Sequence, residues 1–231
     1  MIALIDYGAG NLTSVRKALT ALDAQFATPS EPEQCARFSA LIVPGVGNFA
    51  ATSALVGRWR DAIADAVRTG TPLLGICLGM QWLFDGSDEA PEVPGLGILK
   101  GRVARLRGDA EAGLKIPHVG WNALSRGANP AGSPGAPARL APPTFRGRLL
   151  QGLPVGAHVY FTHSYAAPVT DACVAATTHG ETFAAVVERG NVFGVQFHPE
   201  KSSDAGLQII RNFLEVVRGQ SVAAPRAEAG C

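Results

Sequence analysis

The chain has 231 residues, with 20 Lys and Arg against 19 Asp and Glu and a formal net charge of +1. This balance excludes the strongly charged surface of a nucleic-acid-binding protein or of a protein that binds anionic membranes. The length suits one large domain or two small ones, with a core that needs no disulfides or metals. Charged residues make up 17% of the chain, below the roughly 25% typical of soluble domains, which indicates a large core or a surface covered by a partner.

The chain carries no pattern of a targeting or membrane segment. Its start lacks a basic region followed by a long apolar run, and no apolar stretch reaches the roughly 18 residues of a membrane helix. The four cysteines, Cys35, Cys77, Cys173 and Cys231, include no CxxC pair. We therefore expect a cytoplasmic protein with free thiols, in which Cys35 and Cys173 are small buried hydrophobes.

In the first third of the chain, short apolar runs that end at turn residues alternate with segments of helical spacing. The runs at 2–5, 40–43 and 72–76 predict buried strands. Apolar residues three and four apart predict two intervening helices. The first is capped by Asn11, and its apolar face is Leu12, Val15, Leu19 and Leu22. The apolar face of the second is Leu55, Trp59, Ile63 and Val67, and a third helix is expected to start at Leu78. This alternation indicates a parallel sheet covered on both faces.

The second half reads as short strands followed by one helix. The predicted strands are 98–103, 158–161, 174–177, 183–187 and 192–197, with a hairpin at Gly190-Asn191. A final helix follows, with Ser203 or Asp204 as its cap and Leu207, Ile210, Leu214 and Val217 on one face. The prediction is one mixed α/β domain without internal repeats.

Two segments differ in composition from the rest. Residues 126–148 are rich in Gly, Pro and Ala and contain no acidic residue. We expect a flexible insertion there, because such a segment buries too little apolar surface to offset its ordering entropy. The tail at 219–231 is similar and is expected to be disordered.

The strongest chemical signal is Gly75-Ile76-Cys77-Leu78-Gly79, between a predicted strand and a predicted helix. It is a nucleophile elbow with Cys in place of Ser. The flanking glycines accommodate a sharp turn that exposes the thiol at the carboxyl end of a strand, facing a helix N-terminus. This context favours a nucleophile over a buried structural cysteine.

Gln196-Phe197-His198-Pro199-Glu200 offers a general base and its orienting group. Pro199 favours an extended backbone at His198, in which residues two apart point the same way, so we expect His198 and Glu200 to project together. Alternatives are a surface pair and a zinc site of the H-x-E type, although the P-C-x-x-C segment of zinc deaminases is absent. With Cys77, the pair completes a Cys-His-Glu triad.

Acyl transfer also needs donors for the developing oxyanion. The Leu78 N–H, just after the nucleophile, is the expected first donor. The glycine-rich turn Gly45-Val46-Gly47, after the neighbouring strand, is the expected source of the second. The alternative for this segment is an ordinary strand-to-helix turn.

These motifs in this order, Pro-Gly-Val-Gly from 44, Gly-Ile-Cys-Leu-Gly-Met-Gln from 75 and Phe-His-Pro-Glu-Lys-Ser from 197, resemble the class I (triad) glutamine amidotransferases. Two further motifs, at 6–12 and 115–122, resemble the glutaminase subunits of imidazole glycerol phosphate synthases. The resemblance implies a flavodoxin-like α/β domain over 1–218, with a mixed, mainly parallel central sheet flanked by helices.

The resemblance also implies roles for single residues. Cys77 attacks the side-chain amide of L-glutamine, His198 transfers the proton and Glu200 orients His198. Gln81, Ser164 and Tyr165 match substrate-binding positions. Gly45 and Val46 match a peptide that the free subunit can hold in an inactive orientation. No metal and no cofactor is implied.

The implied partner is a cyclase subunit with a (β/α)8 barrel, which forms a heterodimer and uses the ammonia to make imidazole glycerol phosphate and an aminoimidazole carboxamide ribonucleotide in histidine biosynthesis. Asn11, Trp121 and Lys201 match interface positions, and the alternative for Trp121 is a core residue. Three other functions stay open: a glutaminase subunit of a different amidotransferase complex, a non-catalytic interaction module, and a stand-alone cysteine hydrolase.

Overall fold

A computed structural model describes residues 1–108, 114–127 and 145–219. The helices are α1 Leu12–Ala21, α2 Arg58–Arg68, α3 Leu78–Trp82 and α4 Ser203–Val217, and short 3₁₀ turns cover Pro32–Arg37, Phe49–Leu55 and Pro199–Lys201. The strands are β1 Ile2–Leu4, β2 Phe26–Ala27, β3 Ala40–Gly45, β4 Leu73–Cys77, β5 Gly86–Ser87, β6 Ala90–Pro94, β7 Arg102–Arg105, β8 His118–Ala123, β9 Ser125–Arg126, β10 His158–His163, β11 Tyr165–Ala166, β12 Cys173–His179, β13 Glu181–Arg189 and β14 Val192–Val195.

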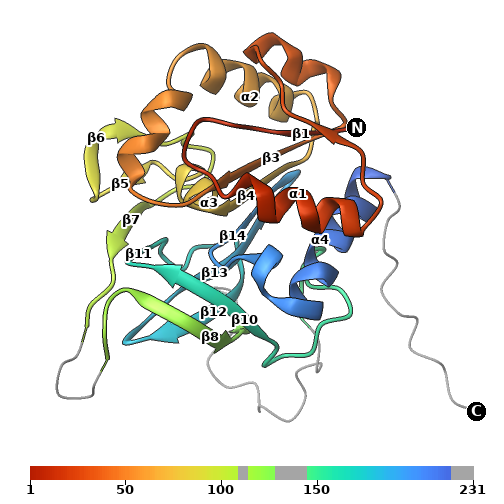
Figure 1. The fold of residues 1–231 in the computed structure, drawn as a ribbon. Coiled ribbons are helices and arrows are strands. Elements are labelled where there is room, and N and C mark those ends of the chain that lie inside the picture. The colour runs from red at the N-terminus through yellow and green to blue at the C-terminus, as the bar shows by residue number, and fades with distance from the viewer. Residues whose placement is uncertain (109–113, 128–144, 220–231) are drawn as a thin grey trace, which may run out of the picture.

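A mixed sheet forms the centre of the molecule, with the strand order β2-β1-β3-β4-β14-β13-β12-β9 (Figure 1). Within this sheet, the neighbouring strands β2, β1, β3, β4 and β14 pair parallel. The remaining neighbours, β14 with β13, β13 with β12 and β12 with β9, pair antiparallel. Two small sheets accompany it, the pair β10-β8 and the sheet β11-β7-β5-β6. The predicted mixed, mainly parallel α/β fold is confirmed.

Helices cover both faces of the parallel part of the sheet. Val15 and Leu19 of α1 pack in the same core cluster as Phe213 of α4. Ile63 of α2 and Met80 of α3 belong to a second cluster on the opposite face. Burial on both faces explains why the parallel strands are almost continuously apolar.

Most predicted elements of the first third are present, including the Asn11 cap, whose side chain accepts from the Ser14 N–H. One helix differs, because Leu55 ends a 3₁₀ turn and α2 begins only at Arg58. The later strands 158–161, 174–177, 183–187 and 192–197 correspond to β10, β12, β13 and β14, and β13 and β14 form the predicted hairpin.

The strand predicted over 98–103 is mostly wrong. β7 starts at Arg102, just after Gly101, whose φ of +117° interrupts an extended backbone. The predicted cap of the last helix is also wrong: Ser202 is the N-cap residue of α4, and its hydroxyl bonds the His198 carbonyl instead of a helical N–H.

The predicted insertion and tail lie partly outside the described residues, at 128–144 and 220–231. The two ends of the insertion belong to the fold, contrary to expectation. Arg126 pairs with β12, and Phe145 is 5% exposed in the core. The Glu188 carboxylate accepts the N–H groups of Arg148 and Leu149, which ties the returning chain to β13.

Among the described residues, no helix combines the length and the apolar character needed to cross a membrane.

Candidate active site

Cys77 occupies a sharp turn between β4 and α3. Its backbone has φ +52° and ψ −107°, a strained conformation for a residue with a Cβ. The flanking glycines make the turn possible, because a Cβ on Gly79 would overlap the carbonyl oxygen of Val43 and one on Gly75 would lie 2.6 Å from the carbonyl oxygen of Gly79. The turn has the predicted elbow geometry and leaves the Cys77 side chain at the carboxyl end of a central strand.

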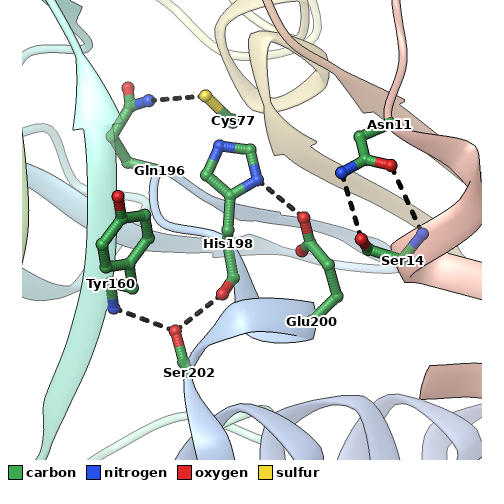
Figure 2. Close-up of polar contacts among 8 residues, drawn as sticks. All are labelled: Asn11, Ser14, Cys77, Tyr160, Gln196, His198, Glu200 and Ser202. Carbon is green, nitrogen blue, oxygen red and sulfur yellow. Dashed lines mark hydrogen bonds and ion pairs between the residues drawn. The ribbon is translucent and has the colours of Figure 1, made fainter. Parts of the chain in front are cut away.

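His198 and Glu200 lie together beside Cys77 (Figure 2). The His198 Nδ1 lies 2.8 Å from the Glu200 Oε1, and both side chains are 2% exposed. They meet for a different reason than the sequence indicated. His198 is extended, but Pro199–Lys201 forms a 3₁₀ turn that brings the carboxylate back to the ring.

The surroundings of His198 favour its role as a base. Burial alone would lower its pKa, but the Cys77 sulfur and the Glu200 carboxylate outweigh burial and raise the pKa. The Nε2 has no hydrogen-bond partner among the described residues, and the imidazole lies between Cys77 and Glu200 (Figure 2). The ring is therefore placed to exchange a proton with the thiol.

The segment predicted to supply oxyanion donors lies next to the elbow. Gly45 pairs with Cys77 across β3 and β4, and Leu78 is the first residue of α3. The Val46 N–H, however, donates to the Ala9 carbonyl at 2.8 Å. In this structure the Gly45-Val46 peptide therefore does not direct its N–H toward Cys77.

Tyr7, which the sequence analysis did not select, lies against this segment. Its hydroxyl is buried without a hydrogen-bond partner among the described residues, and a Cβ on Gly45 would overlap its oxygen. Burial raises the pKa of Tyr7, and the nearby Cys77 raises it further. A side chain at position 45 would thus clash with the Tyr7 hydroxyl and with the Cβ of Leu78.

A cavity of about 290 Å³ opens beside Cys77. This volume is at the lower end of the range for small-molecule sites, so it suits a compact ligand such as an amino acid. The lining combines predicted residues with others that the sequence analysis did not identify: Gly47, Cys77, Leu78, Gln81, Glu89, Pro117, Thr162, His163, Ser164 and Tyr165.

Glu89 and Gln196 are two polar residues of the site that the sequence analysis missed. The Glu89 carboxylate accepts the Phe49 N–H at 2.8 Å and lines the cavity. The buried Gln196 donates its amide to the Cys77 Sγ at 3.7 Å (Figure 2). A signal for Gln196 existed, since it belongs to the same short motif as His198, at the carboxyl end of a predicted strand.

Gln81 is buried rather than solvated, and its contacts set the orientation of its amide. The Nε2 donates to the Tyr165 carbonyl at 2.8 Å and to the Gln196 Oε1 at 3.2 Å. Both N–H groups are therefore used inside the protein. The Gln81 Oε1 is left as an acceptor at the cavity wall.

The three predicted interface residues lie at or near the surface. Trp121 is 53% exposed on β8, which excludes a core position. Lys201 is exposed at the end of its 3₁₀ turn. Asn11 caps α1 through Ser14, and Figure 2 places this pair opposite Glu200.

The other described cysteines are structural, as expected. Cys35 and Cys173 are buried, and burial raises the pKa of each to about 11. Cys231 lies outside the described residues. Within residues 1–108, 114–127 and 145–219, no group of three or more His, Cys, Asp or Glu side chains is arranged to hold a metal ion.

Known proteins of one family are similar to this chain over nearly its whole length. Residues 3–217 match the family model of class-I glutamine amidotransferases. The chain is 43% identical to imidazole glycerol phosphate synthase subunit HisH of Moorella thermoacetica, over 94% of this chain and 95% of that protein. It is also 43% identical to the subunit of the same name from Gloeobacter violaceus, over 100% of this chain and 95% of that protein.

Solved structures share the fold at lower identity. A crystal structure of a glutamine amidotransferase superposes with a TM-score of 0.68 at 22% identity, covering 94% of this chain and all of that one. PurLQS from Thermotoga maritima gives a TM-score of 0.64 at 18% identity, covering 94% of this chain and 98% of that one. The family match over nearly the whole sequence, with relatives of this identity, shows that the chain belongs to the class-I glutamine amidotransferase family.

Proposed function

We propose that this chain is the glutaminase subunit of an imidazole glycerol phosphate synthase and acts in histidine biosynthesis. It hydrolyses L-glutamine to glutamate and ammonia, and the ammonia passes to a cyclase subunit. The observation that carries the proposal is the buried His198–Glu200 pair at 2.8 Å, beside a cysteine on a strained elbow that lines a small polar cavity. The relatives named above support the choice of synthase.

The reaction begins with proton transfer from the Cys77 thiol to the His198 Nε2. The sulfur attacks the amide carbon of glutamine and forms a tetrahedral intermediate. His198 returns the proton to the leaving nitrogen, so ammonia departs and a γ-glutamyl thioester remains. Water, deprotonated by His198, then hydrolyses the thioester to glutamate and restores the thiol. Glu200 holds the imidazole in the required tautomer throughout.

The cavity offers groups for the α-substituents of glutamine. The free Oε1 of Gln81 and the Glu89 carboxylate accept hydrogen bonds from the α-ammonium group. Ser164 and Tyr165, which also line the cavity, hold the α-carboxylate side of the substrate. These assignments place hydrogen-bond acceptors at the cationic α-ammonium group of the substrate. They leave the side-chain amide of glutamine free to reach Cys77.

The Gly45-Val46 peptide supports regulation by the partner. The Val46 N–H donates to Ala9 in this structure, so it is not available to stabilise the oxyanion, and the Leu78 N–H is left as the expected donor. Activation requires rotation of this peptide, after which the Val46 N–H becomes the second donor. One missing oxyanion donor lowers kcat about 10²–10³-fold in other acyl-transfer enzymes. We therefore expect weak hydrolysis by the isolated chain.

The partner is a (β/α)8-barrel cyclase in a heterodimer, docked on the surface that carries Asn11, Trp121 and Lys201. Direct transfer is required because ammonia released into water is largely protonated and no longer nucleophilic. A complex of this kind fits a cytoplasmic protein with reduced thiols.

The test is glutamine hydrolysis by the isolated chain, by the complex, and by the complex with the cyclase's nucleotide ligand. We expect hydrolysis to rise strongly at the last step. Full activity of the isolated chain, unchanged by the cyclase and its ligand, would contradict the coupled reaction.

A further inference from the structure

Two buried histidines lie side by side at the cavity, where His163 is part of the lining, and the triad chemistry does not use them. The strands β8 and β10 lie side by side (Figure 1) and pair antiparallel, and His118 is opposite His163 in their register. The Nδ1 of His118 lies 3.2 Å from the Nε2 of His163, and the residues are 4% and 7% exposed. His118 also stacks on His179, with ring centroids 4.1 Å apart.

The neighbouring groups fix one tautomer for each ring. The Tyr165 carbonyl can only accept, so the Nδ1 of His163, 2.9 Å away, carries a proton. Burial lowers the pKa of His163 to about 3 and that of His118 to about 4, so both rings are neutral near pH 7. The Nε2 of His163 therefore accepts from the Nδ1–H of His118. The Nε2 of His118 in turn accepts from the Asn122 amide at 3.4 Å.

The Tyr165 carbonyl also connects the histidines to the two glutamine amides beside the nucleophile. The Tyr165 carbonyl accepts a second hydrogen bond, from the Gln81 Nε2 at 2.8 Å. The other N–H of that amide bonds the Gln196 Oε1 at 3.2 Å, and the Gln196 Nε2 donates to the Cys77 Sγ (Figure 2). The Tyr165 carbonyl can only accept, so it fixes the direction of both hydrogen bonds, the one from His163 and the one from Gln81.

We propose that His163, held in its Nδ1–H tautomer by His118, is a positioning residue for glutamine binding. It anchors the Tyr165 carbonyl, and this carbonyl holds the Gln81 amide with its Oε1 toward the α-ammonium group of the substrate. The inference rests on the proposed glutaminase function. His163 itself does not contact the reacting atoms.

The first test compares variants in the full complex with the cyclase. His163→Leu leaves the Tyr165 carbonyl with one donor fewer, and KM for glutamine rises about tenfold, the size of one hydrogen bond to a buried group. Synthesis from ammonium salts is unchanged, because it bypasses the cavity. His163→Asn places an N–H near the former Nδ1 and restores most of the loss. His158→Leu, at an exposed position of the same strand, is the matched control and keeps the wild-type KM.

The second test reads the tautomers directly, by long-range proton–nitrogen NMR of the wild-type chain with isotope-labelled histidine. Both His118 and His163 are expected as Nδ1–H tautomers near neutral pH. An Nε2–H tautomer at His163 overturns the proposal, and so does a folded His163→Leu complex with unchanged KM. The wild-type spectrum decides the tautomer whether or not the leucine variant folds. Absence of glutamine hydrolysis in the wild-type complex would instead refute the proposed function.

Discussion

Replacing Glu200 by glutamine tests the orienting role of the carboxylate at constant side-chain size. The His198 Nδ1 lies 2.8 Å from the Glu200 Oε1, with both side chains 2% exposed. The carboxylate can only accept, so it keeps the proton on Nδ1 and leaves Nε2 free to receive the proton of Cys77. An amide can instead present its N–H to the ring and select the wrong tautomer. It also removes the charge that helps to raise the pKa of His198.

The size of the effect follows from the bond that is lost. A hydrogen bond to a charged group contributes about 1.5–3 kcal/mol, which corresponds to a loss of about 10- to 150-fold in kcat/KM. The assay is glutamine hydrolysis by the complex with the cyclase and its nucleotide ligand. Glu92→Gln, on an exposed glutamate of β6, is the control and keeps the wild-type rate. A Glu200→Gln complex with wild-type kcat/KM would refute the reasoning.

Three further predictions follow from packing, from the oxyanion segment and from burial. Gly79→Ala forces a Cβ onto a main-chain oxygen of β3 and lowers the free energy of unfolding by about 3 kcal/mol in denaturant titrations, whereas Gly10→Ala, whose Cβ meets only ordinary contacts, has little effect. Tyr7→Phe removes a buried hydroxyl without a partner and leaves stability equal or higher; a clear loss of stability would show a hydrogen bond that this structure lacks. His118 and His163 have folded-state pKa values of about 4 and 3, below the unfolded value near 6.5, so the unfolded chain binds more protons between these limits. The free energy of unfolding therefore falls as pH drops below about 6.5, by up to about 1.4 kcal/mol per pH unit for each histidine, and a flat profile in this range would contradict their neutral burial.

The local patterns of the sequence predicted the framework of the site. Apolar runs closed by turn residues located β1, β3 and β4, and the glycines around Cys77 predicted the strained turn, because a sharp turn leaves no room for a Cβ. These features depend on neighbours within a few residues. Composition failed at the ends of the Gly- and Pro-rich segment, where single residues such as Phe145 pack into the core.

Long-range pairing decided what the sequence could not predict. Val195 pairs with Ile76, so Gln196 follows at the level of Cys77, but this register is known only once β14 is placed beside β4. Tyr7 reaches the site from a segment far from Cys77 in the chain, after β1, and Glu89 reaches it from the turn between β5 and β6. The hydrogen bond between the Val46 N–H and Ala9 likewise depends on the tertiary fold.

The most direct test of the proposed function is Cys77→Ala in the complex with the cyclase. Synthesis of imidazole glycerol phosphate is measured once with glutamine and once with ammonium salts as the nitrogen source. The account predicts that synthesis from glutamine is abolished and that synthesis from ammonium salts is retained, because only the first needs the thiol. Retention of glutamine-dependent synthesis would contradict the assignment of Cys77 as the nucleophile, and loss of both activities in an intact complex would show that its role is structural.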